Sequence, residues 1–232
     1  MLFRSSITAT GEKIKERFGA DAPGFYEPFY NASHTQLLPV ITNSAPNGIS
    51  TFYWGTSPEW AKGKPLSDKI VNTHAELIPE KSSLRKALMK TRCIVLADGF
   101  YAWKKTGKKT FIPYRFLCTD QPLFSFAGLW DEYEDTDGKE FHTFSIITIP
   151  SNSLVESVHD RMPVILNKKT EAEWLAKENN ETGLLNVLTA YAADKMTHYP
   201  VSPSIANKNI NVASLIRATA PADQFGNLTL FD

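Results

Sequence analysis

The residues best suited to chemistry are at positions 159–163, which read His-Asp-Arg-Met-Pro. The imidazole can transfer protons at neutral pH, the carboxylate can orient it, and the guanidinium can bind an anion. An apolar run at 164–166 follows directly, which places the motif at the mouth of a buried strand. Functional groups are often held at the end of a rigid element in this way. A salt-bridged surface loop is the alternative interpretation.

Two further segments mix polar, aromatic and turn-forming residues as sites do. Asn72 could hydrogen-bond a carbonyl or an aldehyde, and His74 or Glu76 could then handle protons. Trp54 and Trp60 flank a segment that contains Gly and Pro, and they could form a stacking platform for a base. The alternative is that the two tryptophans belong to the core.

Residues 92–103 form a third such segment, which begins as a strand, bends at Asp98-Gly99 and continues with aromatic residues. The bend lies either beneath a surface cleft or within a well-packed β-turn. Lysines then gather around the Thr106-Gly107 turn, at positions 104, 105, 108 and 109. They form a solvated hairpin tip or else contact a phosphate backbone, where each contact adds to a salt-dependent affinity.

Metal, cofactor and hydrolase signatures are absent from the sequence. The five histidines, at 34, 74, 142, 159 and 198, form neither an HExxH motif nor a closely spaced pair, and no CxxC occurs. Phosphate-loop and dinucleotide-binding fingerprints are missing, as is the GxSxG elbow of a serine hydrolase. The sequence therefore predicts a protein without a metal or a cofactor.

The bulk composition is that of an ordinary globular protein, with 232 residues, 42% hydrophobic and 22% charged. We expect a single domain over residues 1–232. The 25 basic and 25 acidic residues cancel, so any nucleic-acid binding must come from a local patch. Cys93 and Cys118 each lie in an apolar stretch, which favours buried thiols in a reducing compartment over a disulfide. Without a signal-like segment or an apolar span, we expect a cytoplasmic protein that enters no membrane.

The polar segments must be positioned by a mixture of strands and helices. A helix is predicted at 11–18, because Thr10 can cap its start and Gly19 can end it. The β-branched and aromatic bias of the middle of the chain indicates strands, and Asp137-Gly138 is a hairpin signal. Further helices are expected at 83–90, 170–178 and 183–192, and strands at 36–41, 49–54, 92–96, 110–118, 122–128, 140–149 and 197–201. This pattern favours an α+β fold around a mixed, curled sheet over a parallel βαβα arrangement.

Taken together and in this order, the segments resemble the SOS response-associated peptidase (SRAP) family, also called abasic-site processing proteins. The resemblance runs from Arg4 to Asn207. Its most specific pieces are Trp54-Gly55 with Pro58 and Trp60, the run at 98–101 with Trp103, and the run at 159–164. The resemblance implies an α+β domain with a twisted, barrel-like mixed sheet, helices beside it and a positively lined cleft for single-stranded DNA.

The resemblance also implies a chemistry of DNA damage. In this family the initiator Met is removed to leave an N-terminal cysteine, whose α-amine attacks the aldehyde of an abasic site. The thiol then closes a thiazolidine ring, which links protein and DNA covalently. The family's Asn and His fall on Asn72 and His159, and Arg4 and Arg161 match arginines near the DNA-facing cleft.

This chain departs from the family pattern at positions that matter for that reaction. Leu2 stands where the cysteine is expected, Ala102 where an acidic residue is expected, and His74 where an arginine is expected. Neither Cys93 nor Cys118 carries a free α-amine, so thiazolidine formation is not expected. The α-amine of Met1 would be displaced by one residue, about 3.8 Å, and roughly a tenth of it is neutral near pH 7. Imine formation and slow β-elimination remain conceivable for it.

Four hypotheses follow. The first is a protein that binds single-stranded, abasic DNA without covalent capture, through residues Arg4, Trp54, Trp60, His74 and Arg161. The second is a residual enzyme, an imine-based abasic-site lyase or peptidase-like hydrolase, that uses the Met1 amine, Asn72 and His159. The third is that Leu2 is not the natural residue, against which Ala102 argues as a second, independent change. The fourth is an unrelated hydrolase that uses Cys93 with His159. Nothing in the sequence specifies an oligomeric state.

Overall fold

The computed structural model describes residues 3–55, 71–134 and 138–228. Met1, Leu2 and Trp60 lie outside these ranges, so the predictions made for them concern residues that the structure does not describe. Within the described ranges, no helix is long and apolar enough to span a bilayer.

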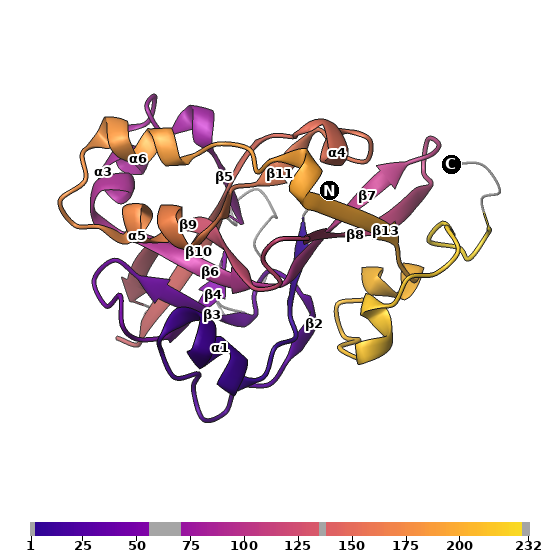
Figure 1. Ribbon diagram of the computed structural model, residues 1–232, viewed down its shortest axis with the longest axis horizontal. Helices are drawn as coiled ribbons and strands as arrows, with labels where there is room; N and C mark the ends of the chain where they lie inside the picture. The colour runs from indigo at the N-terminus through magenta and orange to yellow at the C-terminus, as the bar shows by residue number, and fades with distance from the viewer. Residues whose placement is uncertain (1–2, 56–70, 135–137, 229–232) are drawn as a thin grey trace.

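The fold is α+β, as predicted, and it contains two sheets (Figure 1). The smaller sheet is antiparallel and has the strand order β13 (Met196–Pro200), β8 (Phe111–Cys118), β7 (Gly99–Lys105), β1 (Arg4–Ile7) and β2 (Phe29–Ala32).

The larger sheet has the order β11 (Arg161–Pro163), β10 (Glu140–Pro150), β4 (Ser50–Trp54), β3 (Leu37–Thr42), β6 (Arg92–Ala97), β9 (Phe124–Glu134) and β12 (Ile165–Leu166). The strand β5 (Asn72–His74) also pairs with β10. Because β9 pairs with β10 as well, the strands from β10 through β4, β3 and β6 to β9 close into a ring. The pairing of β4 with β10 is parallel and most other pairs are antiparallel, so the sheet is mixed and barrel-like, and a parallel βαβα arrangement is wrong.

Helices cover the larger sheet at one end. There α3 (Ser82–Lys90), α5 (Lys168–Leu175) and α6 (Glu181–Val187) pack together beside β6 and β9 (Figure 1). The buried guanidinium of Arg92 donates to the last carbonyls of two of these helices, Leu88 and Met89 in α3 and Trp174 in α5. It therefore satisfies helix ends that would otherwise be buried without donors.

The predicted helix at 11–18 is confirmed as α1 (Gly11–Phe18). The Thr10 hydroxyl accepts the Lys13 N–H, and Gly19 ends the helix at φ 72° in the left-handed region, which suits a residue without a Cβ. The helix predicted at 183–192 is shorter than expected, because α6 ends at Val187. The strand predicted at 122–128 is longer, because β9 continues to Glu134 along its partner β10.

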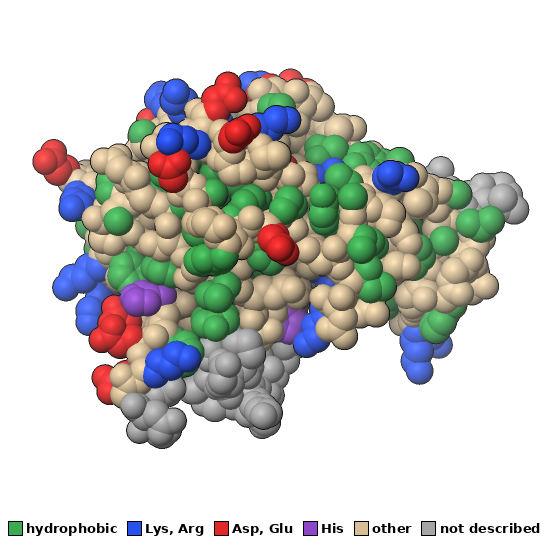
Figure 2. All heavy atoms as spheres, turned by 90° about the horizontal axis from the view of Figure 1, so that it is seen from below, with side chains coloured by type: hydrophobic (Ala, Val, Ile, Leu, Met, Phe, Trp, Pro, Cys, Tyr) green, Lys and Arg blue, Asp and Glu red, His purple; other side chains and the backbone are tan. Residues whose placement is uncertain are grey.

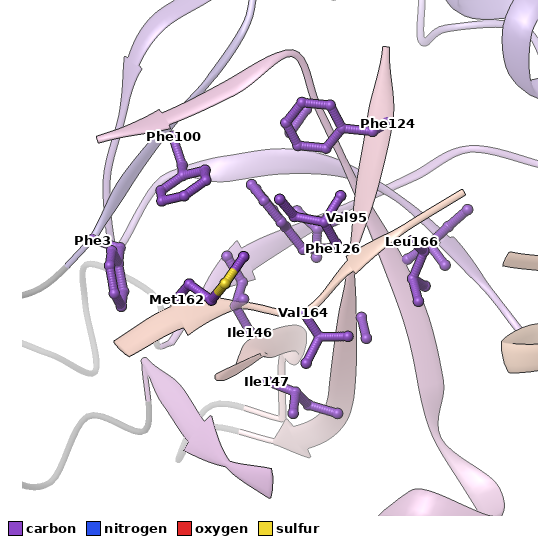
Figure 3. Packing of buried hydrophobic residues seen from close by; sticks show 14 of the residues in the cluster. Phe3, Val95, Phe100, Phe124, Phe126, Ile146, Ile147, Met162, Val164 and Leu166 are labelled. Atoms are coloured by element: carbon purple, nitrogen blue, oxygen red, sulfur yellow. The ribbon is translucent and has the colours of Figure 1, made fainter. Parts of the chain in front are cut away.

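The strand β7 separates two apolar layers. Phe100 and Ala102 point into the main core, where Phe3, Phe100 and Met162 lie close together (Figure 3). Tyr101 and Trp103 point to the opposite face, where the C-terminal segment with the short helices η4 (Pro203–Ala206) and η5 (Ala213–Ile216) covers them. The side chains on both faces of β7 are therefore withdrawn from water as far as Trp103.

Candidate active site

His159 lies in the loop between the short helix α4 (Ser153–Glu156) and β11, and its backbone N–H donates to the Val155 carbonyl over 2.8 Å. The ring of Phe3 lies against the imidazole, with 5.0 Å between ring centroids. Phe3 is itself only 7% exposed and directly precedes β1. The beginning of the described chain is therefore packed onto His159.

The hydrogen bonds of the imidazole fix its orientation. Nδ1 lies 3.1 Å from the backbone nitrogen of Arg161, 3.2 Å from the Arg161 carbonyl oxygen and 3.1 Å from a carboxylate oxygen of Asp160. Burial lowers the pKa of His159, and the nearby Asp160 carboxylate opposes this shift only in part. Since Nδ1 is engaged by Arg161 and Asp160 in either tautomer, Nε2 is the nitrogen that can meet a ligand.

The strand β5, which begins at Asn72, and the strand β11, which follows His159, pair with the same strand, β10. Asn72 lies beside Ile146, and Thr148 has His74 on one side and Pro163 on the other. Adjacent strands are about 4.8 Å apart, so β5 and β11 approach each other across a single strand.

The Asn72 side chain carries an unused acceptor. Its Oδ1 is buried and has no hydrogen-bond partner among the described residues. A buried acceptor without a donor is unfavourable by about 1–3 kcal/mol, which a ligand with a hydroxyl or N–H group would relieve. An aldehyde oxygen can only accept, so it would have to bind the amide N–H of Asn72 and not this oxygen, and the role expected for Asn72 remains a prediction.

Arg161 is held by an ion pair across the mouth of the site. Its Nη1 and Nη2 donate to the two carboxylate oxygens of Glu76 over 2.8 and 3.0 Å, and Nη2 also donates to the Thr148 carbonyl. The hydrogen bonds from Arg161 are the main reason that the pKa of Glu76 is lowered. A phosphate that binds Arg161 therefore has to compete with Glu76. His74 is exposed beside this pair.

The prediction that Trp54 offers its ring to DNA is wrong, because the side chain is fully buried. Its Nε1 donates to the Val71 carbonyl over 2.8 Å, and its ring stacks on Phe144. The alternative interpretation, that this tryptophan belongs to the core, holds. Since Val71 precedes Asn72, Trp54 supports the strand that carries the asparagine.

Arg4 is partly engaged in holding the fold. Its guanidinium donates to Asn31 Oδ1 over 2.8 Å and to the Ala206 carbonyl over 2.7 Å, and it lies over the Trp103 ring. Burial lowers the pKa of Arg4. The side chain links β1 to β2 and to the C-terminal segment, so a DNA contact by Arg4 would be additional to these bonds.

Ala102 faces the beginning of the chain. Arg4 pairs with Tyr101 in the antiparallel register, so the next pair along these strands is Phe3 with Ala102. Ala102 is 1% exposed and lies on the same face of β7 as Phe100. Its methyl group stands on the side of the sheet that meets His159, and it cannot transfer a proton.

A buried polar network, which the sequence did not reveal, holds β1 in place. One carboxylate oxygen of Asp98 accepts the Ser6 hydroxyl over 2.6 Å and Arg115 Nη2 over 3.0 Å. The other accepts the N–H and the hydroxyl of Thr8. Gly99 makes room for this cluster, because a Cβ there would come within 2.9 Å of Arg115 Nε. In the sequence, the Asp98-Gly99 pair was the only signal at this network, and it predicted a bend in the chain rather than an anchor for β1.

Both cysteines are buried, and the described ranges contain no cluster of metal-binding side chains. Cys93 is 0% exposed and burial raises its pKa, so the hypothesis of a hydrolase using Cys93 with His159 is wrong. Burial also raises the pKa of Cys118 to about 12. Over the described ranges, no three side chains of the metal-binding types gather closely enough to hold an ion.

Charges of both signs are interspersed over the face of the molecule drawn in Figure 2. The part of this face that is drawn in colour has no broad basic patch. This agrees with the equal numbers of acidic and basic residues, and any contact with DNA must therefore be local.

Comparison with known proteins identifies relatives over nearly the whole chain. The family model "SOS response associated peptidase (SRAP)" matches residues 1–208. The abasic site processing protein YoqW of Bacillus subtilis is 38% identical over 94% of this chain and 100% of its own length. The abasic site processing protein HMCES of Rattus norvegicus is 30% identical over 87% of this chain and 67% of its own length. A crystal structure of a protein from Bacteroides thetaiotaomicron superposes with a TM-score of 0.82 at 29% identity and covers 94% of this chain and 100% of that one.

Proposed function

This chain belongs to the SOS response-associated peptidase family, and from this membership we propose that it binds single-stranded DNA at abasic sites. Relatives such as YoqW and HMCES are named abasic site processing proteins, which supports an abasic lesion as the ligand. The aldehyde of such a lesion is a small polar group, and the side chains that would receive it here are Asn72 and His159.

The observation that carries the proposal is the contact between Phe3 and His159. It anchors the beginning of the described chain beside the imidazole, with 5.0 Å between the rings. The polar network around Asp98 holds β1 in this position. This contact supports an arrangement in which a group near the start of the chain could meet a ligand held by His159 and Asn72, although the residues of the family reaction have changed.

We propose that binding is reversible rather than covalent. Leu2 supplies no thiol, Ala102 supplies no acid, and the two cysteines are buried. Thiazolidine formation and any thiol-dependent, peptidase-like processing of the chain would therefore be lost.

A binding titration followed by a denaturing gel tests this proposal. We expect the protein to bind a fluorescent single-stranded oligonucleotide with an abasic site more tightly than the intact oligonucleotide, and to release both on denaturation. His159→Gln should reduce the preference for the abasic site. The absence of binding at low ionic strength would refute the function, and a band that survives denaturation and heating would refute the reversible mode.

The position of Phe3 also favours a second candidate, slow imine chemistry at the Met1 amine. Two peptide units separate Phe3 from Met1, a reach of at most about 7 Å between Cα atoms. A neutral amine within that reach could form an imine with the aldehyde, and β-elimination could follow. Borohydride trapping on abasic DNA should give a weak adduct that His159→Ala diminishes. The absence of a trapped adduct would exclude this candidate and leave reversible binding intact.

A further inference from the structure

The contact between His159 and Phe3 joins the two sheets of the fold. His159 lies in the connection between β10 and β11, which belong to the larger sheet, whereas Phe3 directly precedes β1 of the smaller sheet. The centroids of the two rings are 5.0 Å apart. The position of the imidazole against Phe3 therefore depends on how this connection is held on the smaller sheet.

Asn152 caps the short helix α4, which lies within this connection. Its Oδ1 accepts the N–H groups of Leu154 and Val155 over 3.1 and 3.0 Å, the geometry of an N-cap. At the other end of the same turn, the Val155 carbonyl accepts the backbone N–H of His159 over 2.8 Å. Because only one helical turn lies between the Asn152 side chain and the His159 backbone, a displacement of α4 also displaces the imidazole.

The amide nitrogen of the same side chain reaches the smaller sheet. Nδ2 of Asn152 donates to the Tyr191 carbonyl over 2.7 Å and to Sδ of Met196 over 3.2 Å. Met196 is buried at the beginning of β13, and the short helix η3 (Ala193–Lys195), which lies between the two acceptors, packs against α4 (Figure 1). With Oδ1 on α4 and Nδ2 on this segment, the Asn152 side chain bridges the loop of His159 to the smaller sheet.

The carbonyl that receives this amide is itself held in place. The Tyr191 hydroxyl donates to one carboxylate oxygen of Asp120 over 2.7 Å, and Nζ of Lys195 lies 3.3 Å from the other. The backbone N–H of Thr119 donates to the Lys195 carbonyl over 2.8 Å, where β8 ends beside β13. These bonds fix the segment on the end of β8, so the Tyr191 carbonyl is a stationary acceptor for Asn152.

We propose that Asn152 is a positioning residue of the site: it sets the place of the His159 imidazole against Phe3 and, through it, the preference for an abasic site. The first part is a property of the folded chain alone, whereas the second part rests on the proposed function. Asparagine suits this role because its side chain carries both an acceptor and an N–H donor. A serine also caps a helix but has no amide group that could reach the Tyr191 carbonyl.

Two variants separate the cap from the bridge, and a third supplies the control. Asn152→Ser keeps the cap of α4 and removes the amide donor, whereas Asn152→Ala removes both. The matched control is Asn167→Ala, because Oδ1 of Asn167 caps α5 with two equivalent bonds, to the N–H groups of Lys169 and Thr170 over 3.0 Å each. That helix packs beside β6 and β9. Asn152→Ala and Asn167→Ala should both lower the urea midpoint of unfolding, since each loses a cap.

Proton NMR of the His159 ring tests the positioning without any ligand. Burial lowers the pKa of this imidazole, and its charged neighbours are the Asp160 carboxylate and the Arg161 guanidinium. When the bridge is cut, the ring should move from Phe3 and gain water, so its signals should shift and its pKa should rise toward 6.5 in Asn152→Ser and Asn152→Ala. Asn167→Ala should leave both unchanged. If Asn152→Ser keeps the wild-type signals and pKa, the bridge does not position His159 and the inference is wrong.

Binding to single-stranded oligonucleotides tests the second part. The preference for an abasic site is the ratio of the Kd for the intact oligonucleotide to the Kd for the abasic one. Since one or two hydrogen bonds hold the loop, Asn152→Ser should reduce this ratio by about two- to tenfold, toward that of His159→Gln, while Asn167→Ala keeps the wild-type ratio. An unchanged ratio in Asn152→Ser, with a clear preference in the wild type, would overturn the second part and leave the proposed function intact. If the wild type shows no preference, the proposed function fails, whereas the NMR result still decides whether Asn152 positions His159.

Discussion

Replacing Asp98 with asparagine should release β1 from its place beside His159. Asparagine keeps the shape of the side chain, but it offers a single acceptor oxygen to the donors that are divided between the two carboxylate oxygens of Asp98. In one orientation the new amide N–H would face the donors of Arg115 and Ser6, and in the other it would face the N–H and the hydroxyl of Thr8. Removing one partner of a buried ion pair typically lowers stability by about 3–5 kcal/mol, because the other charge stays buried without compensation. The Asp98 and Arg115 side chains are 10% and 7% exposed, so this range applies to them.

Equilibrium unfolding in urea, followed by tryptophan fluorescence, measures the loss directly. The matched control is Glu181→Gln, which breaks the pair with Arg85; those side chains are 32% and 53% exposed, so the loss should be about 0–1 kcal/mol. The double variant Asp98→Asn with Arg115→Met should lose less than the two single losses combined, since it leaves no charge unpaired. A loss below about 1 kcal/mol for Asp98→Asn, similar to that of the control, would refute the claim that this network anchors β1.

Three further predictions follow from burial. Trp54→Phe should lower the free energy of unfolding by about 1–3 kcal/mol, because the buried Val71 carbonyl loses its donor, and a change within error in urea unfolding would contradict this. Proton NMR should show the pKa of His159 below its ordinary value of 6.5. The stability that depends on the neutral imidazole should then be lost as the pH falls from 6.5 through the folded-state pKa, and His159→Gln should remove this part of the pH dependence. An unshifted or raised pKa would contradict the structure. A thiol reagent at pH 8 should find Cys93 and Cys118 unreactive in the native protein and both reactive after denaturation, whereas rapid native labelling would show that the thiols are accessible.

The parts of the fold that could be predicted are those with local signals. The helix α1 has its cap and its terminal glycine in the sequence, and the long strands carry β-branched and aromatic residues. The strand β1 has only four residues, three of them polar, and its pairing depends on Asp98, which is ninety residues away from Thr8. The strand β7 shows no alternation of polar and apolar residues, because the C-terminal segment buries its outer face.

The candidate site was predictable in its composition and less so in its contacts. Asn72 and His159 were identified from their motifs, and β5, which begins at Asn72, and β11, which follows His159, both pair with β10. The burial of Trp54 could not be read from its neighbours in sequence, because flanking Gly and Pro indicate a turn and say nothing about what covers the ring. The pairing of Arg161 with Glu76, which are eighty-five positions apart, depends on the placement of β5 beside β10.

The most direct test of the central claim is an NMR titration of the ¹⁵N-labelled protein with a single-stranded oligonucleotide that carries a stable abasic-site analogue. If the abasic position is received by the proposed site, the His159 ring signals and the Asn72 side-chain amide should shift with a common binding curve, while Cys93 in the core does not respond. An intact oligonucleotide should shift the Asn72 amide less. Binding that leaves His159 and Asn72 unchanged would contradict the assignment of the site.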